Sequence, residues 1–270
     1  MLVTTGKRRC VFCGAGEPTK EHVLRRKFQD LLKSKPETIT FTSNRTTAFG
    51  NRELDFRSHR GKPFDWQVRA ACGACNNGWM NALENAVEDD LLAMVEGRHR
   101  VIPPDRARTL GRWALKTALI RQLMNGTSIA DWTTPRFHEI YQDDLSGPVW
   151  VAVGSVPDST KWPQMPSAVY YQRDAFGEFR VLHSTTLMKR LVVHSAMALD
   201  RGGPPTRYPE LGSLHSEGHH RNMLRSLVPS ASSTTWPIEP PLSDWRYAVN
   251  ITPHLLLASG LVSLSEATFV

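Results

Sequence analysis

The sequence predicts an α+β protein with three parts: an N-terminal module tied together by cysteines, a helical hairpin, and an antiparallel β-rich C-terminal domain. Three observations lead to this prediction. The four cysteines form two Cys-x-x-Cys pairs near the N-terminus, Cys10–Cys13 and Cys72–Cys75. From residue 76 to residue 125, apolar residues recur at three- and four-residue steps, which is typical of helices. After Gly126, short apolar or alternating runs between Gly, Pro and Asp residues indicate strands.

The first predicted unit comprises residues 1–96 and is organised by its cysteines. A Cys-x-x-Cys pair places two thiolates on one tight turn, so two pairs supply the four sulfurs of a tetrahedral Zn²⁺ site. The chain shows no apolar stretch of a secretory signal before Lys7, so we expect a cytoplasmic protein in a reducing compartment. These conditions favour structural zinc over disulfides, with Cys10, Cys13, Cys72 and Cys75 as the ligands.

The elements are expected in the following order. In the first unit we expect a strand at 7–13, a strand followed by a helix at 19–32, loops and short strands at 34–63, a strand at 66–70, and a helix from 76 to Gly97. A second helix within residues 97–126 packs on this module. Residues 127–270 form a β-rich domain of unknown role, with strands at 149–156, 168–173, 178–183, 191–199 and 246–251 and a long loop at 202–241.

Charge is distributed unevenly along the chain. The 270 residues carry a net charge of +7, with 40% hydrophobic and 22% charged residues, which are ordinary values for a globular protein. Residues 1–70 hold 15 Lys and Arg against 7 Asp and Glu, whereas the rest holds 18 against 19. A basic surface of this kind attracts polyanions by releasing their counterions. The position of the excess around the cysteines favours nucleic acid, most of all DNA, as the partner. No apolar run is long enough to cross a membrane.

An acid–histidine pair, Glu21-His22, lies between the two cysteine pairs, and Asn76 follows the last cysteine directly. Hard divalent ions such as Mg²⁺ or Mn²⁺ prefer oxygen ligands and bind through few protein groups, so the Glu21 carboxylate and the Asn76 carbonyl oxygen suit such an ion. The imidazole of His22 titrates near neutral pH and can take a proton from water. These three residues therefore predict a hydrolytic site with one divalent metal beside the zinc.

These motifs resemble those of the HNH (ββα-metal) endonucleases with a four-cysteine zinc. The layout is similar to phage junction-resolving enzymes and to uncharacterised HNH proteins of actinobacteria and their phages. The resemblance rests on Cys10-x-x-Cys13, Glu21-His22-Val23, Cys72 to Met80, Leu83-Glu84 and, more loosely, Trp113 to Thr117. It covers about the first third of the chain.

The resemblance implies a function in phosphodiester hydrolysis. A role in a phage or in defence against phages is the expected setting, and the sequence leaves the biological pathway open. His22 would be the general base, Glu21 and Asn76 the ligands of the catalytic metal, and the four cysteines the zinc ligands. The family usually has Asp at the position of Glu21, and the segment 34–63 is an insertion. The asparagine that braces the base in this family has two candidates in the insertion, Asn44 and Asn51.

Each assignment has a structural alternative. Glu21 could form a salt bridge with Lys20 or Arg25, and Asn76 could cap the helix that it begins. Arg25, Arg26 and Lys27 are placed to meet phosphates, or they form a solvated helix face. The whole module could be a catalytically inactive, zinc-stabilised nucleic-acid-binding unit, or a structural zinc domain that serves protein contacts. The sequence leaves the substrate form and the oligomeric state open.

Overall fold

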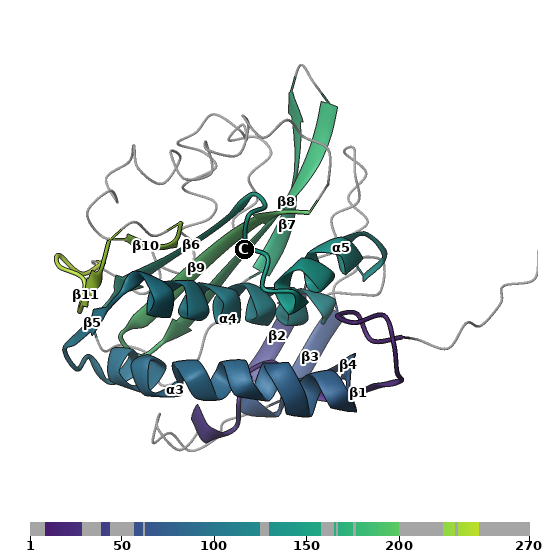
Figure 1. The fold of residues 1–270 in the computed structure, drawn as a ribbon, viewed down its shortest axis with the longest axis horizontal. Coiled ribbons are helices and arrows are strands. Elements are labelled where there is room, and N and C mark those ends of the chain that lie inside the picture. Colours follow the sequence, from purple (N-terminus) through teal and green to yellow (C-terminus); the bar gives the residue numbers. More distant parts are fainter. Residues whose placement is uncertain are drawn as a thin grey trace, which may run out of the picture.

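The computed structural model describes residues 9–28, 39–43, 57–61, 63–124, 130–157, 165, 167–174, 177–199, 224–229 and 232–242. Within these ranges the protein combines helices with antiparallel sheets (Figure 1). Its cysteines cluster near the N-terminus. The α+β class predicted from the sequence is therefore confirmed. No helix of the described part is long and apolar enough to cross a membrane.

An antiparallel strand pair and a following helical run carry the cysteines. Strand β1 (Pro18–His22) pairs with β4 (Gln67–Cys72), so that Glu21 lies opposite Val68 and His22 opposite Gln67. The chain then enters a short helix α2 (Gly73–Cys75), a π-helical turn η2 (Asn76–Met80) and the helix α3 (Asn81–Glu96). Helix α3 ends at Gly97, whose φ of 72° is the left-handed conformation that glycine adopts at helix ends.

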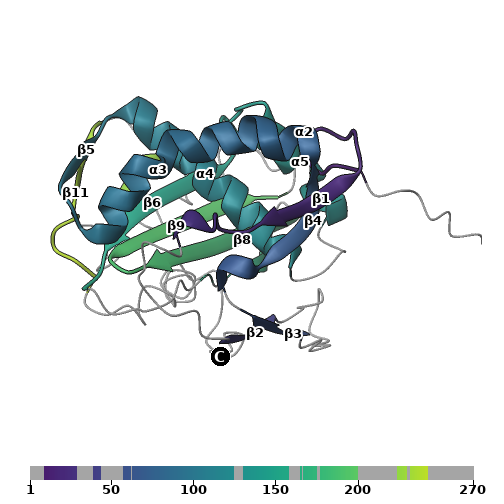
Figure 2. The same cartoon turned by 90° about the horizontal axis from the view of Figure 1, so that it is seen from below.

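Helix α4 (Pro104–Leu123) packs between α3 and the large sheet (Figures 1 and 2). It approaches the sheet closely at Gly111, where a Cβ atom would lie 2.2 Å from Cγ2 of Val228. Trp113, Leu115 and Ile120 of this helix are buried in the core. Because α4 also contacts β4, it joins the cysteine-bearing strand pair to the sheet.

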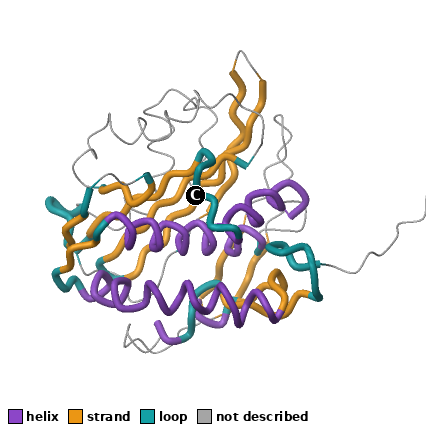
Figure 3. The backbone as a smooth tube through the Cα atoms, in the orientation of Figure 1, coloured by secondary structure: helices purple, strands orange, loops and turns teal. Residues whose placement is uncertain are grey.

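The large sheet is fully antiparallel, and its five strands have the order β10-β6-β9-β8-β7. Figure 3 shows the strands in orange beside the helices in purple. The bounds are β6 (Val149–Ser155), β7 (Ser167–Asp174), β8 (Gly177–Met188), β9 (Leu191–Ala198) and β10 (Arg225–Val228). Two smaller pairs are β5 (Arg100–Ile102) with β11 (Thr234–Trp236), and β2 (Ile39–Ser43) with β3 (Arg57–Gly61). A 3₁₀ turn, η1 (Pro63–Asp65), leads into β4.

Four of the expected strands in the C-terminal part match β6 to β9, but other elements differ from the prediction. Residues 11–13 form a turn rather than the end of a strand, because the cysteine pair itself bends the chain there. Helix α5 (Ala130–Tyr141) was not predicted and lies within the part expected to be β-rich; its Phe137 and Ile140 are buried in the core despite Pro135 inside the helix. Strands β10 and β11 lie within the predicted loop. The predicted strand at 246–251 lies outside the described residues.

One hydrophobic cluster runs through the described part of the chain. It contains Phe12 beside the cysteines, Met94 of α3, Leu115 of α4 and Met197 of the sheet. The division of the chain at residues 96 and 126 stays a prediction.

Candidate metal centre and the adjoining carboxylate site

The four cysteine side chains gather at one point. The sulfur atoms of Cys10, Cys13, Cys72 and Cys75 all lie within 4.8 Å of one another, and Sγ of Cys13 is 3.7 Å from Sγ of Cys72. A tetrahedral zinc with Zn–S bonds of about 2.3 Å requires sulfur–sulfur distances of about 3.8 Å. The four cysteines are thus positioned to hold a metal ion and fit structural zinc, as the sequence predicts.

The first cysteine pair is shaped by two glycines. Gly14 and Gly16 have φ of 71° and 70°, and the backbone N–H of Cys10 donates to the carbonyl of Gly16 at 3.1 Å. A Cβ atom on Gly16 would lie 2.9 Å from Cβ of Cys72. Gly16 is therefore required both by its backbone conformation and by the close approach of the second cysteine pair.

The thiols of the cluster differ in acidity. Burial raises the pKa of Cys75 and of Cys13. Burial also opposes ionisation of Cys10, but backbone N–H groups of Cys13, Cys72 and Phe12 stabilise its thiolate and lower its pKa to about 7. Zinc binds thiolates, so binding of the ion releases protons and weakens as the pH falls.

Aromatic packing fixes the cluster to the rest of the protein. Phe12, between the first two cysteines, makes edge-to-face contacts with Trp79 and Phe137, with ring centroids 5.0 and 5.1 Å apart. Arg112 of α4 lies over the Trp79 ring at 5.1 Å and donates to the carbonyls of Ile140 and Tyr141. The cysteine cluster is therefore braced by α4 and α5 as well as by its own strands.

Glu21 is a buried carboxylate. Its residue is 5% exposed, and no donor of the described residues reaches its side chain. Burial, and then the charge of Glu84, raises its pKa to about 7, although the charge of Lys116 opposes this. The alternative of a salt bridge with Lys20 or Arg25 is not observed. A carboxylate that lacks donors is costly in its charged form, and a proton or a cation would relieve this cost.

The charges of Lys116 and Glu84 act on the carboxyl group of Glu21, and neither residue was singled out from the sequence. The Lys116 ammonium is fully buried, and its Nζ is 2.7 Å from Oε1 of Glu84. The sequence does indicate that Lys116 is buried, because it lies three residues after Trp113 and four before Ile120, on the apolar stripe of α4. A lysine in such a stripe indicates a buried charge with a partner.

His22 lies on the half-exposed side of the strand pair. It follows Glu21 directly in the strand, so its side chain projects in another direction than that of Glu21. Its Nε2 is 2.7 Å from the side-chain amide nitrogen of Gln67, its neighbour across the pair. Burial, followed by the charge of Arg26, lowers the pKa of His22, while Asp65 and Glu84 oppose this shift. The imidazole is therefore neutral at pH 7.

Asn76 lies against strand β1. Its Nδ2 is 3.5 Å from the carbonyl oxygen of Lys20, the residue before Glu21. The alternative of a helix cap is wrong, because the helical run begins at Gly73 and Asn76 itself has helical φ and ψ. Within the described part of the chain, no hydrogen bond joins the side chains of Glu21, His22 and Asn76 directly.

The basic residues after His22 pair with acidic side chains of the protein itself. Arg25 donates to Asn85 and to Glu88 of α3, at 2.6 and 3.0 Å. Lys27 pairs with the same Glu88, and Arg26 pairs with Asp65 at 2.7 Å. A phosphate that binds here would compete with these carboxylates. The bracing candidates Asn44 and Asn51 lie outside the described residues.

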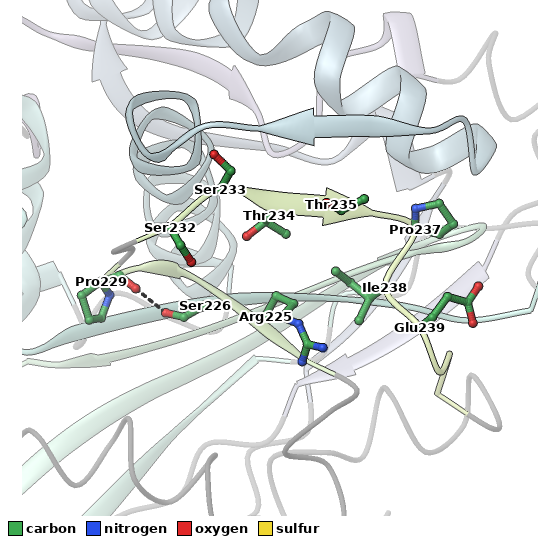
Figure 4. A pocket seen from close by; sticks show the side chains of 10 residues that line it. All are labelled: Arg225, Ser226, Pro229, Ser232, Ser233, Thr234, Thr235, Pro237, Ile238 and Glu239. Atoms are coloured by element: carbon green, nitrogen blue, oxygen red, sulfur yellow. Dashed lines mark hydrogen bonds between the residues drawn. The ribbon is translucent and has the colours of Figure 1, made fainter.

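A separate pocket lies at β10 and β11, which are remote in sequence from the elements that carry the cysteines (Figure 4). Its lining includes Arg225, Glu239 and several hydroxyl groups, and Ser226 donates to the carbonyl of Pro229 at 2.6 Å across its edge. It contains none of the residues that the sequence singled out.

Comparisons with known proteins found no match for this chain. No family model, no curated protein and no solved structure matches it.

Proposed function

We propose that this protein is a metal-dependent endonuclease of the HNH (ββα-metal) type that hydrolyses phosphodiester bonds of nucleic acid, with DNA as the favoured substrate. The observation that carries the proposal is the buried Glu21 carboxylate, which accepts no hydrogen bond from the described residues. It lies on an antiparallel strand pair whose following helical run starts at the cysteine cluster. This order of strand, strand and helix around a metal is the layout that the motifs of the sequence imply.

In this proposal His22 is the general base. Because its pKa is lowered, the imidazole is neutral at pH 7 and has a free electron pair for a proton. The Gln67 amide lies at hydrogen-bonding distance from Nε2 and donates to that nitrogen in the neutral ring. Nε2 is therefore the nitrogen with the free electron pair. In the reaction the attacking water would replace the Gln67 amide at Nε2 and transfer its proton to this nitrogen.

Glu21 and Asn76 would hold a catalytic Mg²⁺ or Mn²⁺. Such an ion neutralises the phosphate and stabilises the leaving oxygen. The Nδ2 group of Asn76 faces the backbone of β1, which leaves its Oδ1 available as a neutral ligand. The cysteine-bound zinc takes no part in the chemistry and holds α2 and η2 against β1.

The basic excess of residues 1–70 supports nucleic acid as the partner. Arg25, Arg26 and Lys27 are the candidates for backbone contacts, at the expense of their ion pairs with Glu88 and Asp65. The second candidate function is a zinc-stabilised nucleic-acid-binding module without cleavage. The Glu in place of the usual Asp favours this second function.

Cleavage of supercoiled plasmid with Mg²⁺ or Mn²⁺ tests the proposal. We expect the zinc-loaded wild type to nick or linearise the plasmid, and His22→Ala to lose at least about 100-fold in rate, the scale of general-base catalysis. The matched control is His99→Ala, which removes an exposed histidine and should leave the rate unchanged.

Equal cleavage by the wild type and His22→Ala would refute the site. Salt-sensitive binding of DNA without cleavage by any of the three proteins would favour the binding module instead.

A further inference from the structure

One carboxylate of α3, that of Glu88, pairs with two cations from the segment that follows β1. Its Oε2 accepts from Nη1 of Arg25 at 3.0 Å, and its Oε1 accepts from Nζ of Lys27. Each oxygen of the carboxylate is therefore held by a different cation. Arg and Lys side chains hold the oxygens of a phosphate by the same charge-assisted hydrogen bonds, so this place already binds an anion.

Two amide side chains of the same helix adjoin this anion site. Arg25 also donates to Oδ1 of Asn85 at 2.6 Å and to Oδ1 of Asn81 at 3.4 Å. Both asparagines are exposed. An amide that accepts a hydrogen bond through its oxygen keeps its NH₂ group as a donor for another acceptor, such as a phosphate oxygen. Helix α3 thus adds polar groups to the basic residues that the sequence singled out.

A purely structural role explains these ion pairs less well. The segment after β1 is already anchored by apolar side chains, since Val23, Leu24 and Phe28 are buried in the core. The side chain of Lys27 is 59% exposed, and an ion pair this exposed adds little to stability. One carboxylate against two cations also leaves a net positive charge, which suits a surface that receives a polyanion.

We propose that Glu88 occupies the place of a nucleic-acid phosphate between Arg25 and Lys27, and that the phosphate displaces it when the nucleic acid binds. Glu88 is then a competitor built into α3. The inference rests on the proposed function, because it concerns the same partner. It predicts that Glu88 weakens the binding of nucleic acid and reduces its dependence on salt, because cations that a carboxylate neutralises release fewer counterions.

Binding of a labelled DNA duplex to the full-length, zinc-saturated chain tests the inference. Fluorescence anisotropy measures the affinity between about 50 and 200 mM KCl, without Mg²⁺ or Mn²⁺ so that no cleavage interferes. Glu88→Gln removes the charge and nearly keeps the volume. The matched control is Asp89→Asn, which removes an exposed carboxylate at the next position of α3 and changes the net charge equally. Lys27→Gln and K27Q/E88Q complete a double-mutant cycle.

We expect Glu88→Gln to bind about 3- to 10-fold more tightly than the wild type, the range for removing two competing exposed ion pairs. Its plot of log affinity against log salt should be steeper by about one. Asp89→Asn should change the affinity by less than about twofold. The gain from Glu88→Gln should shrink in the Lys27→Gln background, because one of the two cations that it frees is gone.

Three results would overturn the inference but keep nucleic acid as the partner. They are equal, salt-sensitive affinities of Glu88→Gln and Asp89→Asn, an equal gain with and without Lys27, and loss of the fold or of zinc by Glu88→Gln. The last result would show that the ion pairs are a structural tie. Absence of salt-sensitive binding by every one of these proteins would remove the partner itself, and with it both the inference and the proposed function.

Discussion

The carboxyl group of Glu21 is buried, and its ionisation therefore lowers the free energy of unfolding. Its pKa is about 7 in the folded chain against an ordinary value of 4.5, so the folded chain holds the proton more tightly than the unfolded chain. Between these values the unfolded chain binds fewer protons, and the free energy of unfolding therefore falls as the pH rises. The cost is absent below pH 4.5 and fully present above pH 7.

We therefore expect Glu21→Gln to raise the free energy of unfolding at pH 8, without added divalent ion. The shift of the pKa corresponds to at most about 3 kcal/mol. The advantage over the wild type should shrink as the pH is lowered from 8 to 6, a range in which urea unfolding can be compared for both zinc-loaded proteins. Glu17→Gln is the matched control, because Glu17 is exposed. A gain of the same size at every pH would show that the ionisation of Glu21 is not its cause.

At the scale of elements, the turn that carries Cys10 and Cys13 depends on Gly16. We expect Gly16→Ala to weaken zinc binding by at least about tenfold, because the alanine is strained at a φ of 70° and its methyl group meets Cβ of Cys72. Gly73→Ala is the control, since a Cβ atom there meets nothing within 4 Å. Competition with a chromophoric chelator measures both affinities, and equal values would show that the turn tolerates a side chain.

The sequence predicted those elements whose pattern is local. The helix that ends at Gly97 and the strands β6 to β9 were recognised because their apolar residues repeat at regular steps. Helix α5 was missed because Pro135 interrupts its pattern, and its stability comes from packing of Phe137 and Ile140. Strands β10 and β11 are short, and pairing with β6 and β5 defines them.

The candidate site was predictable to a similar degree. The spacing of the cysteines was enough to predict the metal cluster, since each Cys-x-x-Cys pair is a local turn. The charges that act on Glu21 come from two helices that are remote in sequence, so the effect of Glu84 and Lys116 on its pKa was not predicted. The ion pairs of Arg25 and Lys27 with Glu88 likewise arise from the packing of α3 on the segment after β1.

For the whole molecule, the strand pair β1 and β4 carries both the cysteine cluster and the Glu21 carboxylate. The four cysteines and the Phe12–Trp79 contact fix the helical run against β1. The charge of Lys116 on α4, which is paired with Glu84, also acts on the carboxyl group of Glu21. The central claim of this account is that zinc is structural and that a second ion at Glu21 performs the hydrolysis.

The most direct test is cleavage of plasmid by zinc-saturated protein, with and without Mg²⁺, for the wild type and for Glu21→Gln at equal zinc content. The account predicts that the wild type cleaves after Mg²⁺ is added and not with zinc alone. It also predicts that Glu21→Gln keeps one zinc per chain, remains folded, and loses at least about 100-fold in rate, because the Mg²⁺ that stabilises the transition state is no longer held. Cleavage at the wild-type rate by Glu21→Gln, or by the zinc-loaded wild type without Mg²⁺, would contradict it.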